Sequence, residues 1–272
     1  AVTALVLYRE KDRNKHFRTV IPDLIEWATR LEAWDAVTQL NLFLGSAYGL
    51  LGQIDEGRPY ILKALDLARE HQLEQITYIL NRLCFLSIRS GTLDQASHFA
   101  RESVLTSETW GDTRGVARGY SMLARTHWQL GDTDSAAFYV NEAAIRYERI
   151  GSMRGLAEVW NTRGELARAR GDLDAAEVAY REANAHYESC GSSDAVFCKL
   201  NLGSTYVKGK KFRKARAILD TLENNVLESG HVSIIMVTQL VRVNCFIHDQ
   251  DWERVEADLD RLAPKLEEVG LF

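Results

Sequence analysis

Apolar side chains recur every three or four residues over most of the chain. Two successive stripes are Leu40, Leu44, Tyr48 and Leu51, and then Ile61, Ala64, Leu65, Leu67 and Ala68. This spacing places apolar side chains on one face of an α-helix and polar ones on the opposite face. Consecutive stripes therefore predict amphipathic helices that bury their apolar faces against one another.

Short turn sequences separate these helices at a nearly constant interval. Six related hexapeptides begin at Gly52, Gly91, Gly131, Gly171, Lys210 and Gln250, so the steps between their starts are 39, 40, 40, 39 and 40. A second series lies midway between these starts and consists of Gln72, Gly111, Gly151, Gly191, Gly230 and Gly270. Glycine takes the left-handed conformation of a helix C-cap without steric cost. The two series predict a repeat of about 40 residues that contains two antiparallel helices.

Small residues mark the place where the two helices of a repeat are expected to touch. Seven positions before the turn starts stand Gly45, Cys84, Ala124, Gly164 and Gly203, with Val243 as the exception. A bulky side chain there would force the helices apart. The turns also carry helix caps. Thr92 with Gln95 predicts a capping box, and Asp132 and Asp172 are predicted to accept amide hydrogen bonds from the following helices.

These features together resemble the tetratricopeptide repeat. The shared pattern is the small residue, a ring three positions later as in Tyr48, His127 and Tyr206, and the turn Gly-x-x-x-x-Ala. The period near 40 is longer than the usual 34. It is similar to the repeats of kinesin light chains and bacterial signalling regulators, which often carry a proline where this chain has Pro59. The resemblance covers residues 36–270 and implies an all-α fold, a right-handed solenoid of antiparallel helix pairs.

The resemblance also divides the chain. Residues 36–272 are interpreted as six repeats and residues 1–35 as a partial, degraded one, with a turn at residues 12–17 and a helix at residues 24–31. The fifth and sixth repeats lack the turn glycine, and Pro264 is expected to kink or end its helix. Neither end resembles the polar capping repeat of a free-standing solenoid. We therefore expect a segment of a longer protein.

Composition narrows the classes of function. The formal net charge of −5 argues against a chain that coats nucleic acid or an anionic membrane non-specifically, because both need a large basic excess. No apolar run approaches the roughly 20 residues that span a bilayer. The four cysteines form no C-x-x-C pair, which indicates a reducing, cytoplasmic environment.

Catalytic and cofactor-binding motifs are missing from the sequence. It contains no G-x-x-x-x-G-K-[ST] phosphate loop, no G-x-S-x-G nucleophile and no H-E-x-x-H zinc motif. We expect neither enzymatic activity nor a cofactor or metal. His127 falls on the core side of its helix and is interpreted as structural. The aspartate pairs of two turns, at residues 132 and 134 and at residues 172 and 174, are explained better by helix capping than by calcium binding.

The resemblance implies that the first helices of successive repeats line a concave groove. The predicted partner-binding residues are Tyr78, Asn81, Arg82, Phe85, Arg89, Arg118, Arg125, Trp128, Asn161 and Arg168. Guanidinium groups bind carboxylates and phosphates bidentately, aromatic rings supply interface hot spots, and asparagine amides can hold an extended peptide backbone. The alternative is structural: Glu158 and Glu165 pair with arginines of adjacent helices, and the rings pack between repeats.

The sequence thus predicts a protein-interaction module in a larger signalling or regulatory protein. Its groove would bind a partner segment, acidic if the arginines contact it, or another domain of the same polypeptide. The alternative function is an effector-sensing arm of a bacterial kinase or ATP-dependent transcription regulator that binds a small ligand. Nucleic acid is disfavoured because no face shows a continuous basic stripe.

Overall fold

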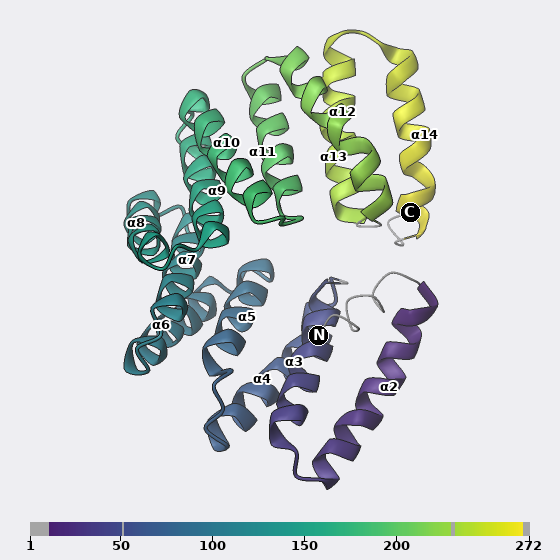
Figure 1. Ribbon diagram of the computed structural model, residues 1–272. Helices are drawn as coiled ribbons and strands as arrows, with labels where there is room; N and C mark the ends of the chain where they lie inside the picture. Colours follow the sequence, from purple (N-terminus) through teal and green to yellow (C-terminus); the bar gives the residue numbers. More distant parts are fainter. Residues whose placement is uncertain (1–10, 51, 230–231, 269–272) are drawn as a thin grey trace. The chain divides into compact units, whose positions relative to one another are not determined.

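The computed structural model describes residues 11–50, 52–229 and 232–268, and over these ranges the chain forms thirteen α-helices and no strand (Figure 1). The helices are α2 (Lys11–Arg30), α3 (Trp34–Leu50), α4 (Ile54–Glu70), α5 (Ile76–Arg89), α6 (Leu93–Thr109), α7 (Thr113–Gln129), α8 (Thr133–Arg149), α9 (Met153–Ala169), α10 (Leu173–Ser189), α11 (Ala195–Lys208), α12 (Phe212–Ser229), α13 (Val232–His248) and α14 (Trp252–Glu268). They fall into two compact units, Ala1–Gly151 and Ser152–Phe272. The predicted all-α class is confirmed.

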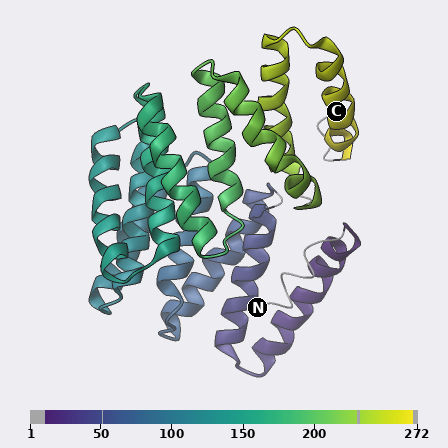
Figure 2. The same cartoon turned by 45° about the horizontal axis from the view of Figure 1, so that its top comes forward.

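Both units are stacks of helix pairs. In the first unit, each helix packs on the next one along the chain, from α2 to α8. In addition, α3 contacts α5 and α5 contacts α7, so these first helices lie side by side in one layer, and α4, α6 and α8 form the other (Figures 1 and 2). In the second unit the same order runs from α9 to α14, and α11 contacts α13. The predicted solenoid architecture is confirmed.

Residues with left-handed backbone end the helices at the turns. Gly52 (φ 81°) and Gly111 (φ 69°) represent the two glycine series. In the fifth and sixth turns Lys210 (φ 55°) and Gln250 (φ 58°) take the same conformation although they carry side chains. That conformation costs a residue other than glycine about 1–2 kcal/mol. The pairs α11–α12 and α13–α14 form nevertheless, because their packing outweighs this cost.

The backbones of paired helices approach closely where small residues were predicted to lie. A Cβ atom added to Gly45 would lie 2.6 Å from the carbonyl oxygen of Gly57, and one added to Gly57 would lie 2.5 Å from that of Gly45. The helices α3 and α4 therefore touch through their main chains. In α9, the ring of Tyr180 occupies the space beside Gly164, 2.6 Å from where a Cβ atom would be.

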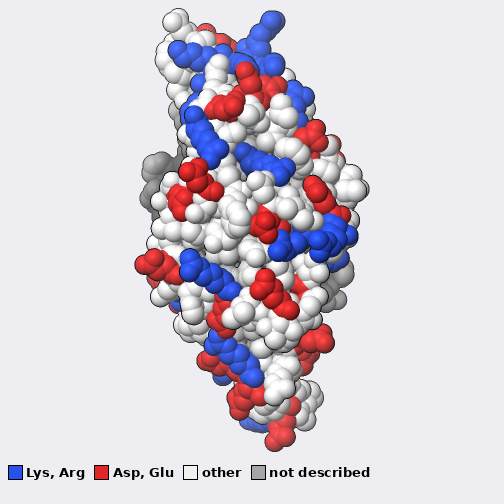
Figure 3. Space-filling view, turned by 90° about the vertical axis from the view of Figure 1, so that its left-hand side faces the viewer, with Lys and Arg blue, Asp and Glu red and all other residues white. Residues whose placement is uncertain are grey.

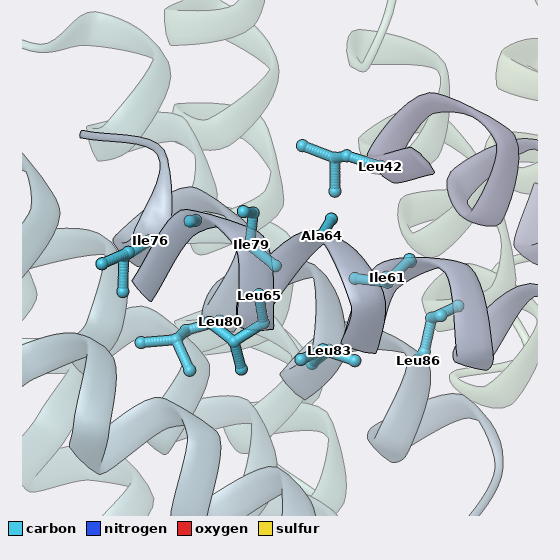
Figure 4. Packing of buried hydrophobic residues seen from close by; sticks show 10 residues of the cluster. Leu42, Ile61, Ala64, Leu65, Ile76, Ile79, Leu80, Leu83 and Leu86 are labelled. Atoms are coloured by element: carbon cyan, nitrogen blue, oxygen red, sulfur yellow. The ribbon is translucent and has the colours of Figure 1, made fainter. Parts of the chain in front are cut away.

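The core lies between the helices rather than at one centre. In the first unit, apolar side chains of α3, α4 and α5 converge, as Figure 4 shows. The labelled members of this cluster are Leu42, Ile61, Ala64, Leu65, Ile76, Ile79, Leu80, Leu83 and Leu86. In the second unit, Tyr180, Tyr206 and Leu219 join α10, α11 and α12. Each helix thus buries one apolar stripe against both of its neighbours in the chain.

Two expectations about helix ends are wrong. Helix α2 runs without a break through residues 12–17, where a turn was predicted, because this segment holds neither glycine nor proline to stop it. Helix α14 continues past Pro264. Proline leaves the carbonyl group four residues earlier, that of Asp260, without its amide donor. Asp260 and Pro264 are both exposed, so water can satisfy that carbonyl.

Of the predicted helix caps, two form and one does not. The carboxylates of Asp132 and Asp172 accept hydrogen bonds of 3.0 Å from the amides of Ser135 and Ala175, as predicted. The predicted capping box of Thr92 and Gln95 does not form, because the Thr92 side chain caps no amide. Both side chains instead accept hydrogen bonds from the guanidinium group of Arg58 on α4. In the described part of the chain, no helix is both long and apolar enough to cross a membrane.

Candidate partner-binding surface

Eight of the ten predicted partner-binding residues lie on two helices that contact each other in the first unit. Helix α5 carries five of them and α7 carries three, at intervals that place them on one face of each helix. We call this set the α5–α7 surface; it consists of Tyr78, Asn81, Arg82, Phe85, Arg89, Arg118, Arg125 and Trp128. The other two residues, Asn161 and Arg168, lie on α9 in the second unit.

Guanidinium groups and rings alternate on the α5–α7 surface. The Cζ atom of Arg118 lies 5.9 Å from the ring centre of Tyr78. The Cζ atoms of Arg125 and Arg89 lie 5.5 Å and 6.0 Å from the ring centre of Phe85. Cation–π contacts at these distances favour guanidinium groups that lie over the rings. The contacts of Arg118 and Arg125 also join α7 to α5.

The arginines of this surface have no carboxylate partner. Among the described residues, no Asp or Glu lies within ion-pair distance of Arg82, Arg89, Arg118 or Arg125. The protein contacts of Arg82 and Arg89 are to neutral oxygens: Nε of Arg82 donates to the Ser46 hydroxyl (3.3 Å), and Nη1 of Arg89 donates to the Gly49 carbonyl (2.8 Å). The α5–α7 surface therefore carries positive charge that no neighbouring side chain neutralises.

Asn81 is the polar residue at the floor of this surface. Its side chain is only 5% exposed, and neither Oδ1 nor Nδ2 has a hydrogen-bond partner among the described residues. Leaving a buried amide unpaired costs about 1–3 kcal/mol per group. Native proteins keep such groups rarely, so an unpaired buried amide calls for an explanation.

The equivalent residue of the second unit is already satisfied. Nδ2 of Asn161 donates to Glu165 Oε1 (3.2 Å), and Oδ1 of Asn161 accepts a hydrogen bond from Asn201 Nδ2 (3.0 Å). The guanidinium group of Arg168 stacks on Tyr180, with 5.8 Å between Cζ and the ring centre. Here the structural interpretation of the predicted residues fits the contacts better than the partner-binding one.

Sequence reasoning missed the buried Asn41 and Asn201, the side-chain partner of Asn161, because both lie one residue away from the repeat position that Asn81 and Asn161 share. Asn41 lies four residues before Gly45 and Asn201 lies two residues before Gly203, whereas Asn81 and Asn161 lie three residues before Cys84 and Gly164. Ser121 occupies the position of Asn81 and Asn161 in the intervening repeat, and its hydroxyl donates to the Ala117 carbonyl (3.1 Å). Asn41 is buried and donates to the Val37 carbonyl (2.8 Å). Among these asparagines, Asn81 differs in having an unpaired side chain.

His127 lies among structural partners. Its Nδ1 atom is 3.1 Å from Asp132 Oδ2, and its ring centre is 5.1 Å from that of Tyr139. The pKa of Asp132 is lowered, first by hydrogen bonds from Ser135 and then by His127. Burial raises the pKa of the Cys84 thiol to about 11, so this thiol does not act as a nucleophile near neutral pH. No cluster of three or more His, Cys, Asp or Glu side chains suited to a metal occurs within the described residues.

The charges of one face of the molecule are drawn in Figure 3. Lys and Arg side chains alternate there with Asp and Glu side chains, and neither sign gathers into a patch. A mixed surface of this kind has little long-range attraction for a charged polymer.

Comparison with known proteins finds tetratricopeptide repeats in two of these helix pairs. The tetratricopeptide repeat family model matches residues 38–71, within α3 and α4 and just beyond, and residues 117–144, within α7 and α8. Both segments contain one antiparallel helix pair of the first unit. No protein of curated function is significantly similar to the chain in sequence.

Solved structures of other helical-repeat proteins share the fold. BtubC (BKLC) of P. vanneervenii, a kinesin-light-chain-like protein, is 24% identical with a TM-score of 0.62, over 79% of this chain and 92% of that one. A signal-transduction ATPase (STAND protein) with a tetratricopeptide repeat sensor, from Pyrococcus horikoshii, is 14% identical with a TM-score of 0.60, over 91% of this chain and 41% of that one. A Rap protein complexed with Competence and Sporulation Factor is 13% identical with a TM-score of 0.53, over 96% and 88%. At these identities the likeness concerns the fold.

Proposed function

Because two of its helix pairs match the tetratricopeptide repeat model, we propose that this chain is a non-catalytic interaction module whose α5–α7 surface binds an acidic protein segment. The segment belongs to a partner protein or to another domain of the same polypeptide. The observation that carries the proposal is the group of four arginines on α5 and α7 that have no carboxylate partner among the described residues. Carboxylates of a bound segment would complete bidentate ion pairs with these guanidinium groups.

The unpaired side chain of Asn81 favours a bound segment in extended rather than helical conformation. The backbone N–H and C=O groups of an extended chain are free to bond, whereas those of a helix bond internally. The unpaired Nδ2 and Oδ1 atoms of Asn81 match one such donor and one such acceptor. Tyr78, which is 45% exposed, and the half-buried Phe85 and Trp128 supply apolar contact area beside it.

The structural relatives support an interaction role of this kind. One of them is a Rap protein that was solved in complex with Competence and Sporulation Factor. The repeats of another form the sensor of a signal-transduction ATPase, which favours a second candidate function, that of an effector-sensing arm in a larger regulatory protein. The free state of all four cysteines supports a reducing, cytoplasmic location for either function.

The direct test is charge reversal on α7. The variant Arg118→Glu with Arg125→Glu removes two of the four unpaired charges and repels carboxylates, so acidic peptides selected from a random library on the unmodified protein should no longer bind it. Fluorescence anisotropy measures the affinity, and circular dichroism should show an unchanged helix content. The matched control is Arg101→Glu with Arg213→Glu, two exposed residues outside the surface that give the same change in net charge. Equal loss of affinity in both double variants would contradict the proposal.

A further inference from the structure

A cleft of the first unit lies away from the α5–α7 surface. It is a cleft of about 400 Å³ between α6, α7 and α8, which we call the Ser107 cleft. Its volume is that of a small-molecule site rather than of a groove for a polypeptide. Val116 of α7 lines it, and Arg125 lies nine residues further along the same helix. Nine residues are about two and a half turns, so the two residues lie on opposite sides of α7.

The cleft lies where a small residue stands at a repeat position that carries tyrosine in the next two repeats. The residues at this position of successive repeats are Ala68, Ser107, Tyr147 and Tyr187. In the second unit Tyr187 is nearly buried and packs against Ala157 and Cys198. Serine fills far less of that space. The Ser107 side chain is fully buried in the wall of the cleft, and its hydroxyl has no hydrogen-bond partner among the described residues.

The charges around the cleft are only partly paired. Arg146 is fixed, because its Nη1 atom lies 2.7 Å from Glu142 Oε2 and its Cζ atom lies 4.5 Å from the ring centre of Tyr120. Glu108 near the end of α6 and Arg149 at the end of α8 also line the cleft. Neither of these two makes an ion pair with any described residue, and they do not pair with each other. The rim therefore offers one unpaired anion and one unpaired cation.

We propose that the Ser107 cleft binds a free aliphatic α-amino acid. Its carboxylate pairs with the guanidinium group of Arg149, and its ammonium group pairs with the Glu108 carboxylate. Its side chain packs on the aliphatic walls formed by Val116 and Ile145. A simple acid or a simple amine would leave one of the two charges unpaired, so the cleft selects a zwitterion. This inference goes beyond the proposed function and does not depend on it.

Isothermal titration calorimetry with three matched ligands tests the proposal. Leucine carries both charges, isopentylamine lacks the carboxylate, and 4-methylpentanoate lacks the ammonium group. We expect saturable binding of leucine to one site per chain, and affinities about tenfold lower or weaker still for the other two. No saturable binding of leucine, isoleucine or valine would overturn the proposal. Equal affinity for leucine and either truncated ligand would overturn the zwitterion assignment.

Single substitutions test whether leucine binds in the Ser107 cleft. Arg149→Gln and Glu108→Gln change exposed ends of helices and should each lower the affinity for leucine about tenfold, whereas Arg101→Gln should not change it. Ser107→Tyr restores the side chain of the equivalent position and should abolish binding by filling the cleft. Should that variant fail to fold, the two charge variants still decide the outcome, and unchanged leucine affinity in both would refute the assignment.

The two proposed sites can fail separately. Arg118→Glu with Arg125→Glu should leave leucine binding unchanged, because these residues lie on the other side of α7. Arg149→Gln should leave acidic-peptide binding unchanged. A chain that binds leucine but no acidic peptide would refute the proposed function and retain this inference.

Discussion

At the scale of single residues, two asparagines at one position of the repeat differ in their hydrogen bonding. Asn161 bonds to two neighbouring side chains, whereas Asn81 bonds to none in the described structure. A buried polar group that makes its hydrogen bonds stabilises the fold, and one that lacks them costs free energy until a ligand supplies the partner. The same residue type therefore serves the fold in the second unit and remains available to a ligand in the first.

Replacing the two asparagines by leucine should separate these roles. Asn161→Leu should lower the free energy of unfolding by about 1–3 kcal/mol, because Asn201 and Glu165 lose a partner. Asn81→Leu should leave that free energy unchanged or raise it, yet weaken acidic-peptide binding about tenfold. Urea denaturation measures stability and anisotropy measures binding. A similar destabilisation by both variants would mean that Asn81 has a structural partner.

The cap of α8 should make stability depend on pH. Hydrogen bonds from Ser135 and the proximity of His127 lower the pKa of Asp132 in the folded chain. Its ionised form is therefore favoured on folding, and this contribution is present above the unfolded pKa of about 4 and is lost as the pH falls through the lower folded value. Asp132→Asn keeps an acceptor oxygen but no charge. The difference in stability between this variant and the unmodified chain should be constant near neutral pH and shrink in acid. Thermal denaturation at a series of pH values measures it. A difference that does not change with pH would mean that the negative charge of Asp132 does not stabilise the fold.

Sequence reasoning at this scale succeeds where the partner is local. Asp132 and Asp172 cap amides three residues away, so their roles are visible in the chain itself. Thr92 and Gln95 have the same local pattern, but both side chains accept hydrogen bonds from Arg58, which lies more than thirty residues earlier. Asn81 shows the same limit, because whether a buried amide finds a partner depends on neighbouring helices.

At the scale of helices, contacts between small residues decide how closely the pairs pack. Ala176, at the start of α10, is fully buried, whereas Ala175 beside it is exposed. Ala176→Leu should therefore lower the free energy of unfolding by about 1–3 kcal/mol, because overpacking forces the helices apart. Ala175→Leu adds the same atoms to water and serves as the control. If denaturation shows equal stabilities for the two variants, the close contact does not limit the packing.

The helices themselves could be predicted because two independent signals coincide. Glycines give the ends, and apolar stripes give the buried faces. The errors occur where one signal is weak. No breaker stops α2 at residues 12–17, and an exposed Pro264 does not end α14. Lys210 and Gln250 show that a turn can keep its geometry when packing replaces the glycine signal.

At the scale of the whole molecule, the α5–α7 surface concentrates positive charge that the net charge of −5 conceals. Four arginines without carboxylate partners lie on α5 and α7, whereas positive and negative side chains are mixed over the face in Figure 3. The proposed preference for an acidic segment thus depends on the local charge of the α5–α7 surface rather than on the net charge of the chain.

Acidic-peptide binding should therefore weaken with salt. Because exposed ion pairs are screened, the affinity should fall about tenfold or more between about 0.05 and about 0.5 M NaCl. The same peptide with glutamine in place of each glutamate is the control and should bind weakly at all salt concentrations. An affinity that salt does not change would indicate recognition by apolar contacts alone.

The position of the candidate surface could be inferred from the repeat, but the ion pairs and hydrogen bonds that its residues make or lack could not. The constant period and the resemblance together put Arg118 and Arg125 on the same side of the helix layer as Phe85, and the structure places them in contact distance of that ring or of Tyr78. The division into two units after Gly151 has no counterpart in the sequence, because that glycine is an ordinary member of its series. The Ser107 cleft was missed as well, although the sequence shows serine at residue 107 where the next two repeats carry Tyr147 and Tyr187.

The glycine contact between α3 and α4 has a mechanical consequence. The main chains of Gly45 and Gly57 meet directly, so a rotamer change at either residue cannot alter the spacing of the two helices there. We therefore expect α3 and α4 to move together as one rigid body. Any adjustment to a ligand in this part of the chain has to take place at its junction with α5, where side chains can rearrange.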